Sequence, residues 1–268
     1  MEKNLNEISK NIRKEIIKLV YEAGSGHPGG SLSIVDILTV LYFKEMNINK
    51  DNIKNPERDR FVLSKGHAAP AIYATLKEKG ILQEPDMKNF RQVDGILQGH
   101  PDMKKILGID MTTGSLGQGI SAAVGMAIAG KLDKKDYRIY CILGDGEIEE
   151  GQVWEATMSA SHYKLDNLCL IIDNNNLQID GSIKDIMSSY PIDKKFESFG
   201  FSVINIDGHN FDEIENAFIE AKKTKNKPTA IIARTIKGKG ISYMENKVEW
   251  HGKAPNKELY EQAIKELS

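Results

Sequence analysis

The sequence predicts an α/β fold with one doubly wound, mostly parallel sheet and helices on both of its faces. Short apolar runs alternate with segments whose apolar residues recur at helical spacing. The apolar runs are 61–63, 137–143, 168–173, 201–206 and 229–233. Strands of a buried parallel sheet are apolar throughout, and helical crossovers must connect them. Since no repeat or linker is visible in 268 residues, we expect a single domain over 1–268.

The helices follow from the same periodicity. Ile8, Ile12 and Ile16 share one helical face, which predicts a helix over 5–23 that ends at Gly24. Further helices are expected over 33–45, 68–79, 150–163 and 211–224, with a last one after a glycine- and lysine-rich loop at 235–256. In the second helix, Ser33 is the expected N-cap.

The stretch 117–131 (GQGISAAVGMAIAGK) is dominated by small residues. A helix of this composition can lie close against another backbone, so we expect it to be buried. It lacks the continuous run of about 20 apolar residues that a membrane span needs.

Composition and charge exclude several classes of protein. The formal net charge of −2 gives no reason to expect nucleic acid or an anionic membrane as a partner. The N-terminus, MEKNLNEISKNIRKEI, is polar and does not resemble a secretory signal. Cys141 and Cys169 lie inside apolar runs, which predicts buried, reduced thiols. We therefore expect a cytoplasmic protein.

Polar side chains follow two neighbouring strands of the predicted sheet. Asp145 lies in a Gly-Asp-Gly turn after one strand, and the cluster Asn174–Asn176 follows the next. Carboxyl ends of parallel strands meet at one edge, where ligands of doubly wound folds bind. Asp and Asn offer the hard oxygen ligands that Mg²⁺ requires, and a diphosphate can complete the octahedron. The alternative is that both are ordinary turn residues, an interpretation weakened by their spacing.

Histidines give a second signal, because five of the six lie beside glycine in predicted loops. These five are His27, His67, His100, His209 and His251. Loops far apart in the sequence that each carry a histidine suggest one polar pocket able to bind hydroxyls and shuttle protons. Their spacing does not match a zinc site. The loop Thr112–Gly119 (TTGSLGQG) is only weak evidence for dinucleotide binding, and a loop fitted against a flat ring explains it equally well.

Taken together, these motifs resemble those of the transketolase family. GDGEIEEG…DNNNLQIDG is similar to the thiamine diphosphate motif, and SGHPGG, LSKGHAAPAIYA, GHPD, TTGSLGQGISAAVGMAIA and WHGK occur in the order that the family shows. The resemblance implies the diphosphate-binding domain of that fold. It also implies that Asp145, the Asn175 side chain and the Leu177 carbonyl ligate a Mg²⁺ or Ca²⁺ that bridges the diphosphate.

The resemblance implies further roles for residues of this chain. Positions that match cofactor contacts are His67, Gly146, Lys237 and His251, with Gly114, Ser115 and Leu116 around the cofactor rings. His27, His100 and His251 match substrate-contacting histidines, and Glu150 matches a glutamate near the cofactor and the subunit interface. Gly30 departs from members that carry a side chain there. His162 and His209 are expected to be structural or to lie on the surface.

The resemblance covers only the first portion of a full-length transketolase. The pyrimidine and C-terminal domains are absent, and with them the glutamate that activates the cofactor. We therefore expect one subunit of a split transketolase, active only with a pyrimidine-domain partner that acts on sugar phosphates. Two chains of each kind would form the assembly, with 117–131 and 150–163 as candidate contact surfaces. Other thiamine diphosphate enzymes (2-oxoacid dehydrogenase or deoxyxylulose-phosphate synthase type), a split transketolase for a branched or sulfonated sugar, and a non-catalytic remnant are the alternatives.

Overall fold

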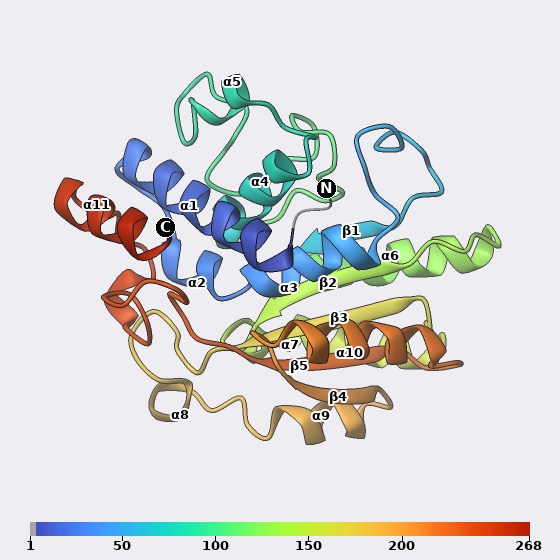
Figure 1. Ribbon diagram of the computed structural model, residues 1–268. Helices are drawn as coiled ribbons and strands as arrows, with labels where there is room; N and C mark the ends of the chain where they lie inside the picture. Colours follow the sequence, from blue (N-terminus) through green and yellow to red (C-terminus); the bar gives the residue numbers. More distant parts are fainter. Residues whose placement is uncertain (1–3) are drawn as a thin grey trace.

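The computed structural model describes residues 4–268, so residues 1–3 of the predicted domain lie outside the described residues. At its centre is one five-stranded parallel sheet in the order β1-β2-β3-β5-β4 (Figure 1). The strands are β1 Arg60–Leu63, β2 Ile139–Gly144, β3 Leu168–Asn174, β4 Ser202–Asp207 and β5 Thr229–Arg234. The chain steps from β1 to β3, crosses to the edge at β4 and returns to β5. The predicted doubly wound α/β fold is therefore confirmed.

Helices cover both faces of this sheet. One face packs against α6 (Gly119–Leu132), α7 (Gly151–His162) and α9 (Ile192–Ser198). The other face carries α1 (Leu5–Ala23), α3 (Val35–Val40), α4 (Ala69–Glu78) and α10 (Phe211–Lys223). Successive β2 side chains enter opposite layers, because Tyr140 and Ile142 join the second layer while Cys141 and Leu143 join the first. Four short or terminal helices complete the fold: α2 Pro28–Leu32, α5 Glu84–Met87, α8 Ile183–Ile186 and α11 Lys257–Glu266.

The expected helix over 33–45 is wrong as a single element. The helix α2 ends at Ser33, α3 follows, and Leu41–Glu45 form a π-helical turn. Ser33 is thus the C-cap of α2 and not an N-cap. Its hydroxyl lies 2.7 Å from Asp173 Oδ2 in β3. A bond to a buried carboxylate 140 residues away, which no local pattern reveals, takes the place of the local cap.

The small-residue helix is buried on one side only. Ile120, Ala123 and Ala127 of α6 are fully buried against the sheet. Gly125 and Ala129 are exposed, so the expectation of a buried helix is wrong for that face. The sequence hides this difference because small residues make up both faces of the helix.

The remaining expectations concern compartments. Cys141 and Cys169 are buried free thiols, as the sequence predicts. Across residues 4–268, no helix combines the length and the apolarity needed to cross a membrane.

Candidate functional site

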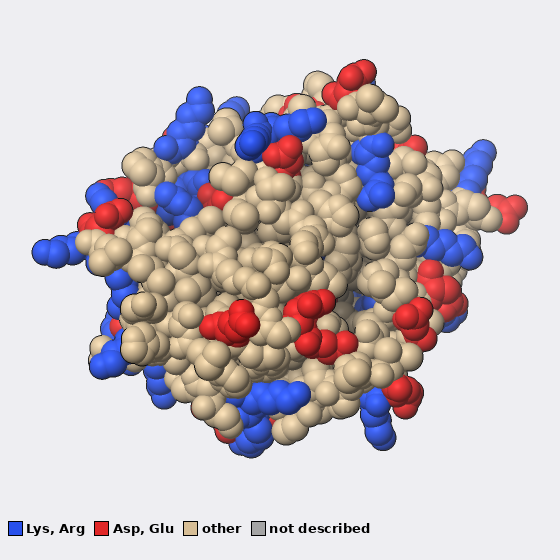
Figure 2. Space-filling model, turned by 180° about the vertical axis from the view of Figure 1, so that it is seen from behind, with Lys and Arg blue, Asp and Glu red and all other residues tan. Residues whose placement is uncertain are grey.

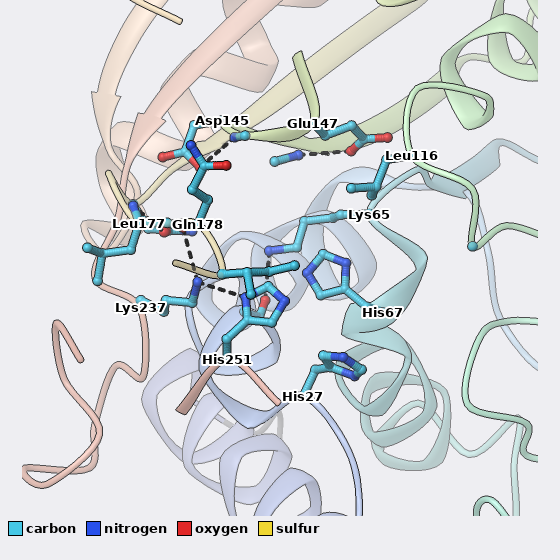
Figure 3. Close-up of a pocket in the computed structure, with 16 residues that line it drawn as sticks. His27, Lys65, His67, Leu116, Asp145, Glu147, Leu177, Gln178, Lys237 and His251 are labelled. Atoms are coloured by element: carbon cyan, nitrogen blue, oxygen red, sulfur yellow. Dashed lines mark hydrogen bonds between the residues drawn. The ribbon is translucent and has the colours of Figure 1, made fainter. Parts of the chain in front are cut away.

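The predicted site residues converge on a pocket at the carboxyl ends of β1, β2 and β3 (Figure 3). Those that line it are His27, His67, Gly114, Leu116, Asp145, Gly146, Asn175, Leu177, Lys237 and His251. Three expected residues do not line it. His100 and Ser115 are exposed beside it, and Glu150 is exposed with its Cβ close to Gly117.

Asp145 joins the ends of β2 and β3. It is 2% exposed, and its two oxygens accept the backbone N–H groups of Gly146 at 3.0 Å and Asn176 at 2.6 Å. Burial raises the pKa of Asp145 to about 7, and the nearby Asp173 carboxylate adds to the effect. The residue does cap a turn, but no ion pair of the described residues compensates its charge. A turn does not require such a carboxylate, whereas a bound divalent cation would compensate it.

Asn175 presents its side-chain oxygen in a fixed direction. The Nδ2 group donates to Asp173 Oδ2 at 2.9 Å, and Oδ1 accepts the Leu177 N–H at 3.1 Å. These bonds assign the amide orientation, because a flipped amide would set its donor against another donor. Oδ1 keeps a second lone pair that a cation could use. The Leu177 carbonyl, the third expected ligand, accepts from Lys237 Nζ at 3.0 Å.

Asp173 and Lys65 form a buried ion pair that the sequence reasoning missed. Asp173 is 0% exposed at the end of β3, and its Oδ2 lies 2.5 Å from Lys65 Nζ. Its other oxygen accepts the Thr235 hydroxyl. Burial alone would raise the pKa of Asp173, but Lys65 and the hydroxyl donors outweigh it and hold the pKa below its usual value. The available signal was a charged residue in or just after an apolar strand.

Glu147 was missed as well. It is 3% exposed, and its Oε1 accepts the Ser64 hydroxyl and the Gly117 N–H, the latter at 3.0 Å. The other oxygen, Oε2, accepts the Gly144 N–H at 3.0 Å. One side chain thus ties the end of β1, the loop before α6 and the end of β2 into a single wall of the pocket.

Lys237 places a buried cation in the pocket. It is 2% exposed, and Nζ contacts the Leu177 carbonyl and His251 Nδ1, each at 3.0 Å. Burial lowers the pKa of Lys237 to about 8, and the nearby Lys65 contributes in the same direction. Both hydrogen-bond partners are uncharged groups. An anion bound here would supply the missing negative charge.

Three histidines line the pocket beside this lysine (Figure 3). The ring centroids of His27, His67 and His251 are 5.2–5.4 Å apart. Burial, aided by nearby positive charge, lowers the pKa of His27 to about 4 and that of His251 to about 3, and also lowers that of His67. All three rings are therefore neutral at pH 7. His27 Nδ1 is buried without a hydrogen-bond partner in the described protein, which suits a ligand hydroxyl.

Gly30 leaves space next to these side chains. A Cβ at this position would lie 3.3 Å from His67 Nε2 and 3.4 Å from Lys65 Nζ. The departure from relatives with a side chain here therefore widens the pocket. The other two histidines lie elsewhere. His162 is exposed at the end of α7, and the His209 side chain is 11% exposed and bonded to Asp36, as expected for a structural residue.

Comparison with known proteins follows from this geometry. A family model described as transketolase, thiamine diphosphate binding domain, matches residues 5–267. The chain belongs to this family. The assignment favours a thiamine diphosphate-binding domain of the transketolase type over a dinucleotide site or the other thiamine diphosphate enzymes considered above.

Two relatives of this transketolase domain have similar length. One of the two subunits of an apulose-4-phosphate transketolase from Phocaeicola vulgatus is 43% identical over 97% of this chain and 92% of its own length. The 6-deoxy-6-sulfo-D-fructose transketolase subunit SqwG of a Clostridium species is 47% identical over 96% and 93%. Human transketolase is 47% identical over 98% of this chain, which spans only 42% of that protein.

Solved structures agree with the fold. The transketolase of Campylobacter jejuni superimposes with a TM-score of 0.92 at 37% identity, covering 98% of this chain and 42% of the other. The transketolase of Leishmania mexicana gives a TM-score of 0.94 at 32% identity over 100% and 42%. The sheet and its helices therefore correspond to the first part of these longer enzymes.

Proposed function

We propose that this chain is the diphosphate-binding subunit of a split transketolase. It would transfer a two-carbon ketol unit from a ketose to an aldose together with a second chain that carries the pyrimidine domain. The observation that supports this best is the pattern of coverage: the chain spans 92–93% of two relatives named as transketolase subunits but 42% of the human enzyme.

Asp145, Asn175 and the Leu177 carbonyl are the proposed ligands of a Mg²⁺ or Ca²⁺ ion. Their fit rests on the buried, uncompensated Asp145 carboxylate and on the fixed Asn175 oxygen. The metal would neutralise the diphosphate and join it to the edge of β2 and β3. Because Lys237 also contacts the Leu177 carbonyl, its ammonium group would stand beside the same phosphates.

Thiamine diphosphate, when bound, supplies the nucleophilic carbon and the electron sink for the carbon–carbon bond change. This chain would hold its diphosphate with Gly146, His67, Lys237 and His251. The loop that carries Gly114, Ser115 and Leu116 would face the rings, since Gly114 and Leu116 line the pocket. Glu150 would belong to the nearby subunit contact, because it is exposed against the same loop.

His27, His100 and His251 are the proposed substrate contacts. Neutral imidazoles can both donate to and accept from sugar hydroxyls, and His27 Nδ1 has no other partner in the described protein. His100 lies at the rim, where its ring would be 3.2 Å from a Cβ on Gly114. We infer that these rings orient the hydroxyls and move protons between them, while the walls exclude water.

The partner would cover the open side of the pocket. Leu116 and Ile179 line the pocket and yet are 36% and 65% exposed. Figure 2 shows a broad central area with few charged side chains on the back of the molecule, apart from a few acidic ones in its lower half. A heterotetramer of two chains of each kind, with the activating glutamate on the partner, is the proposed assembly. We propose that it acts in the cytoplasm on sugar phosphates, as in the pentose phosphate pathway.

A second candidate is transfer to or from an unusual sugar. Two relatives with 43% and 47% identity are named for apulose 4-phosphate and for a sulfonated fructose. The chemistry of this pocket is the same for both candidates, because it would contact the reacting end of the sugar.

The proposal is tested by assaying ketol transfer with this chain alone, the partner alone and the two together. We expect transfer only in the mixture, with Mg²⁺ and thiamine diphosphate present. Robust transfer by this chain alone would overturn the split-enzyme proposal. A parallel set of ketose donors, phosphorylated and sulfonated, separates the two candidates by their kcat/KM ratios.

A further inference from the structure

A buried polar network lies behind the pocket and joins three distant parts of the chain. Arg13 of α1 donates to both oxygens of Asp36 in α3, at 3.0 and 2.6 Å. His209, in the loop after β4, places Nδ1 2.8 Å from Asp36 Oδ2. The three side chains are only 7%, 7% and 11% exposed. Bidentate geometry of this kind fixes the carboxylate in one orientation.

The network sets the tautomer of His209. Because the Asp36 carboxylate can only accept, Nδ1 of His209 carries the proton and Nε2 is left as an acceptor. Nε2 accepts the backbone N–H of Ile236 at 2.9 Å. Ile236 directly precedes Lys237, so this bond fixes the main chain next to the pocket lysine.

Arg13 fixes the same segment on its other side. Its Nε donates to the Lys239 carbonyl at 3.2 Å. Gly240 has φ +94°, and a Cβ there would lie 3.0 Å from Arg13 Cδ. A glycine therefore allows both the backbone turn and the close approach of the arginine. The segment is pinned at 236 and at 239, with Lys237 between the two anchors.

We propose that Arg13, Asp36 and His209 position Lys237 for the diphosphate of the cofactor. The lysine has a long, flexible stem, and its ammonium group reaches the Leu177 carbonyl and His251 only from a fixed main chain. The inference rests on the proposed function, because the diphosphate is the anion that Lys237 would meet there. It makes His209 a positioning residue and not merely a packed one.

Two substitutions at His209 separate its two hydrogen bonds. His209→Gln extends an amide towards the place of Nε2, where it can still accept the Ile236 N–H. His209→Asn keeps a donor near the place of Nδ1 for Asp36 but is too short to reach Ile236. We expect His209→Asn to weaken thiamine diphosphate binding about tenfold, the effect of one lost hydrogen bond. His209→Gln should stay within about threefold of the wild type.

Arg13→Lys provides a second test at the other anchor. A lysine can keep the charge opposite Asp36, but it has no Nε group to bind the Lys239 carbonyl. Tyr140→Phe is the matched control, because it removes a buried hydrogen bond of 2.7 Å to Glu45 at the opposite end of the sheet. It should lower thermal stability without changing cofactor affinity.

The assembled complex is titrated with thiamine diphosphate at saturating Mg²⁺, and amide exchange of the 235–240 peptide is measured in the same samples. We expect His209→Asn and Arg13→Lys to bind more weakly and to exchange faster there than Tyr140→Phe at equal loss of Tm. If both lower Tm but match Tyr140→Phe in affinity and exchange, the positioning role is overturned. If the wild-type complex binds no cofactor, the proposed function fails, and unchanged exchange in His209→Asn then overturns the pinning as well.

Discussion

Replacing Asp173 by asparagine tests whether the buried ion pair supports the pocket. Lys65 and Asp173 are 1% and 0% exposed. The amide has the same shape, and its oxygen can still accept from Ser33 and Asn175, while the Thr235 hydroxyl can turn to accept from its NH₂ group. The main loss is therefore the negative charge opposite the Lys65 ammonium.

The expected cost follows from this geometry. Removing one partner of a buried ion pair costs about 3–5 kcal/mol, because the other charge stays buried without compensation. Lys65 keeps its bond to the Gly30 carbonyl at 2.8 Å, which favours the lower end, about 3 kcal/mol. At roughly 2–4 °C per kcal/mol for a chain of this size, Tm should fall by about 6–12 °C.

Urea unfolding of the chain gives the free energy directly in a double-mutant cycle with Lys65→Met. The double variant buries neither charge, so we expect its loss to be smaller than the sum of the single losses by about 2 kcal/mol. Thr235→Val is the control, with an expected loss of about 1 kcal/mol for one neutral hydrogen bond. Additive losses, or a loss below about 1 kcal/mol for Asp173→Asn, would refute the reasoning.

Three further predictions concern the pocket itself. Gly30→Ala should weaken cofactor binding several-fold in a titration while leaving Tm nearly unchanged, because its Cβ would crowd His67 Nε2 at 3.3 Å. The pKa of His251 is lowered to about 3, so only the unfolded chain binds its proton between pH 6.5 and 3. Relative to His251→Gln, the wild type should lose stability as the pH falls through this window, by less than about 1.4 kcal/mol per pH unit because the ring is partly exposed. The raised pKa of Asp145, about 7, has the opposite sign. Without metal, the wild type should lose stability relative to Asp145→Asn as the pH rises from 4 to 7, measured by thermal unfolding.

The strands could be predicted from the sequence because each is buried on both faces. The run at 168–173 became Leu168–Asn174, and the other four runs shifted by only one or two residues at their ends. The helix expected over 33–45 failed because Ser33 bonds to Asp173, a contact between residues 140 positions apart. The exposed face of α6 escaped notice because its composition equals that of the buried face.

The site divides in the same way. Asp145, Asn175 and the pocket histidines could be found because they follow apolar strands or lie in glycine-rich loops. Lys65, Asp173 and Glu147 were missed because their roles depend on partners across the sheet, such as the Glu147 bond to Ser64 83 residues away. A charged residue within a buried strand is the local signal that remains, since an unpaired charge is rarely buried.

The most direct test of the account is metal-dependent binding of thiamine diphosphate to the assembled complex. Wild type and Asp145→Asn are titrated with the cofactor in Mg²⁺ and in EDTA, and Tyr140→Phe serves as the control. We expect wild type and Tyr140→Phe to bind in Mg²⁺ and to lose at least about a hundredfold in affinity in EDTA, whereas Asp145→Asn should bind weakly in both. Equal binding by wild type and Asp145→Asn in both buffers would contradict a metal-bridged diphosphate at the ends of β2 and β3.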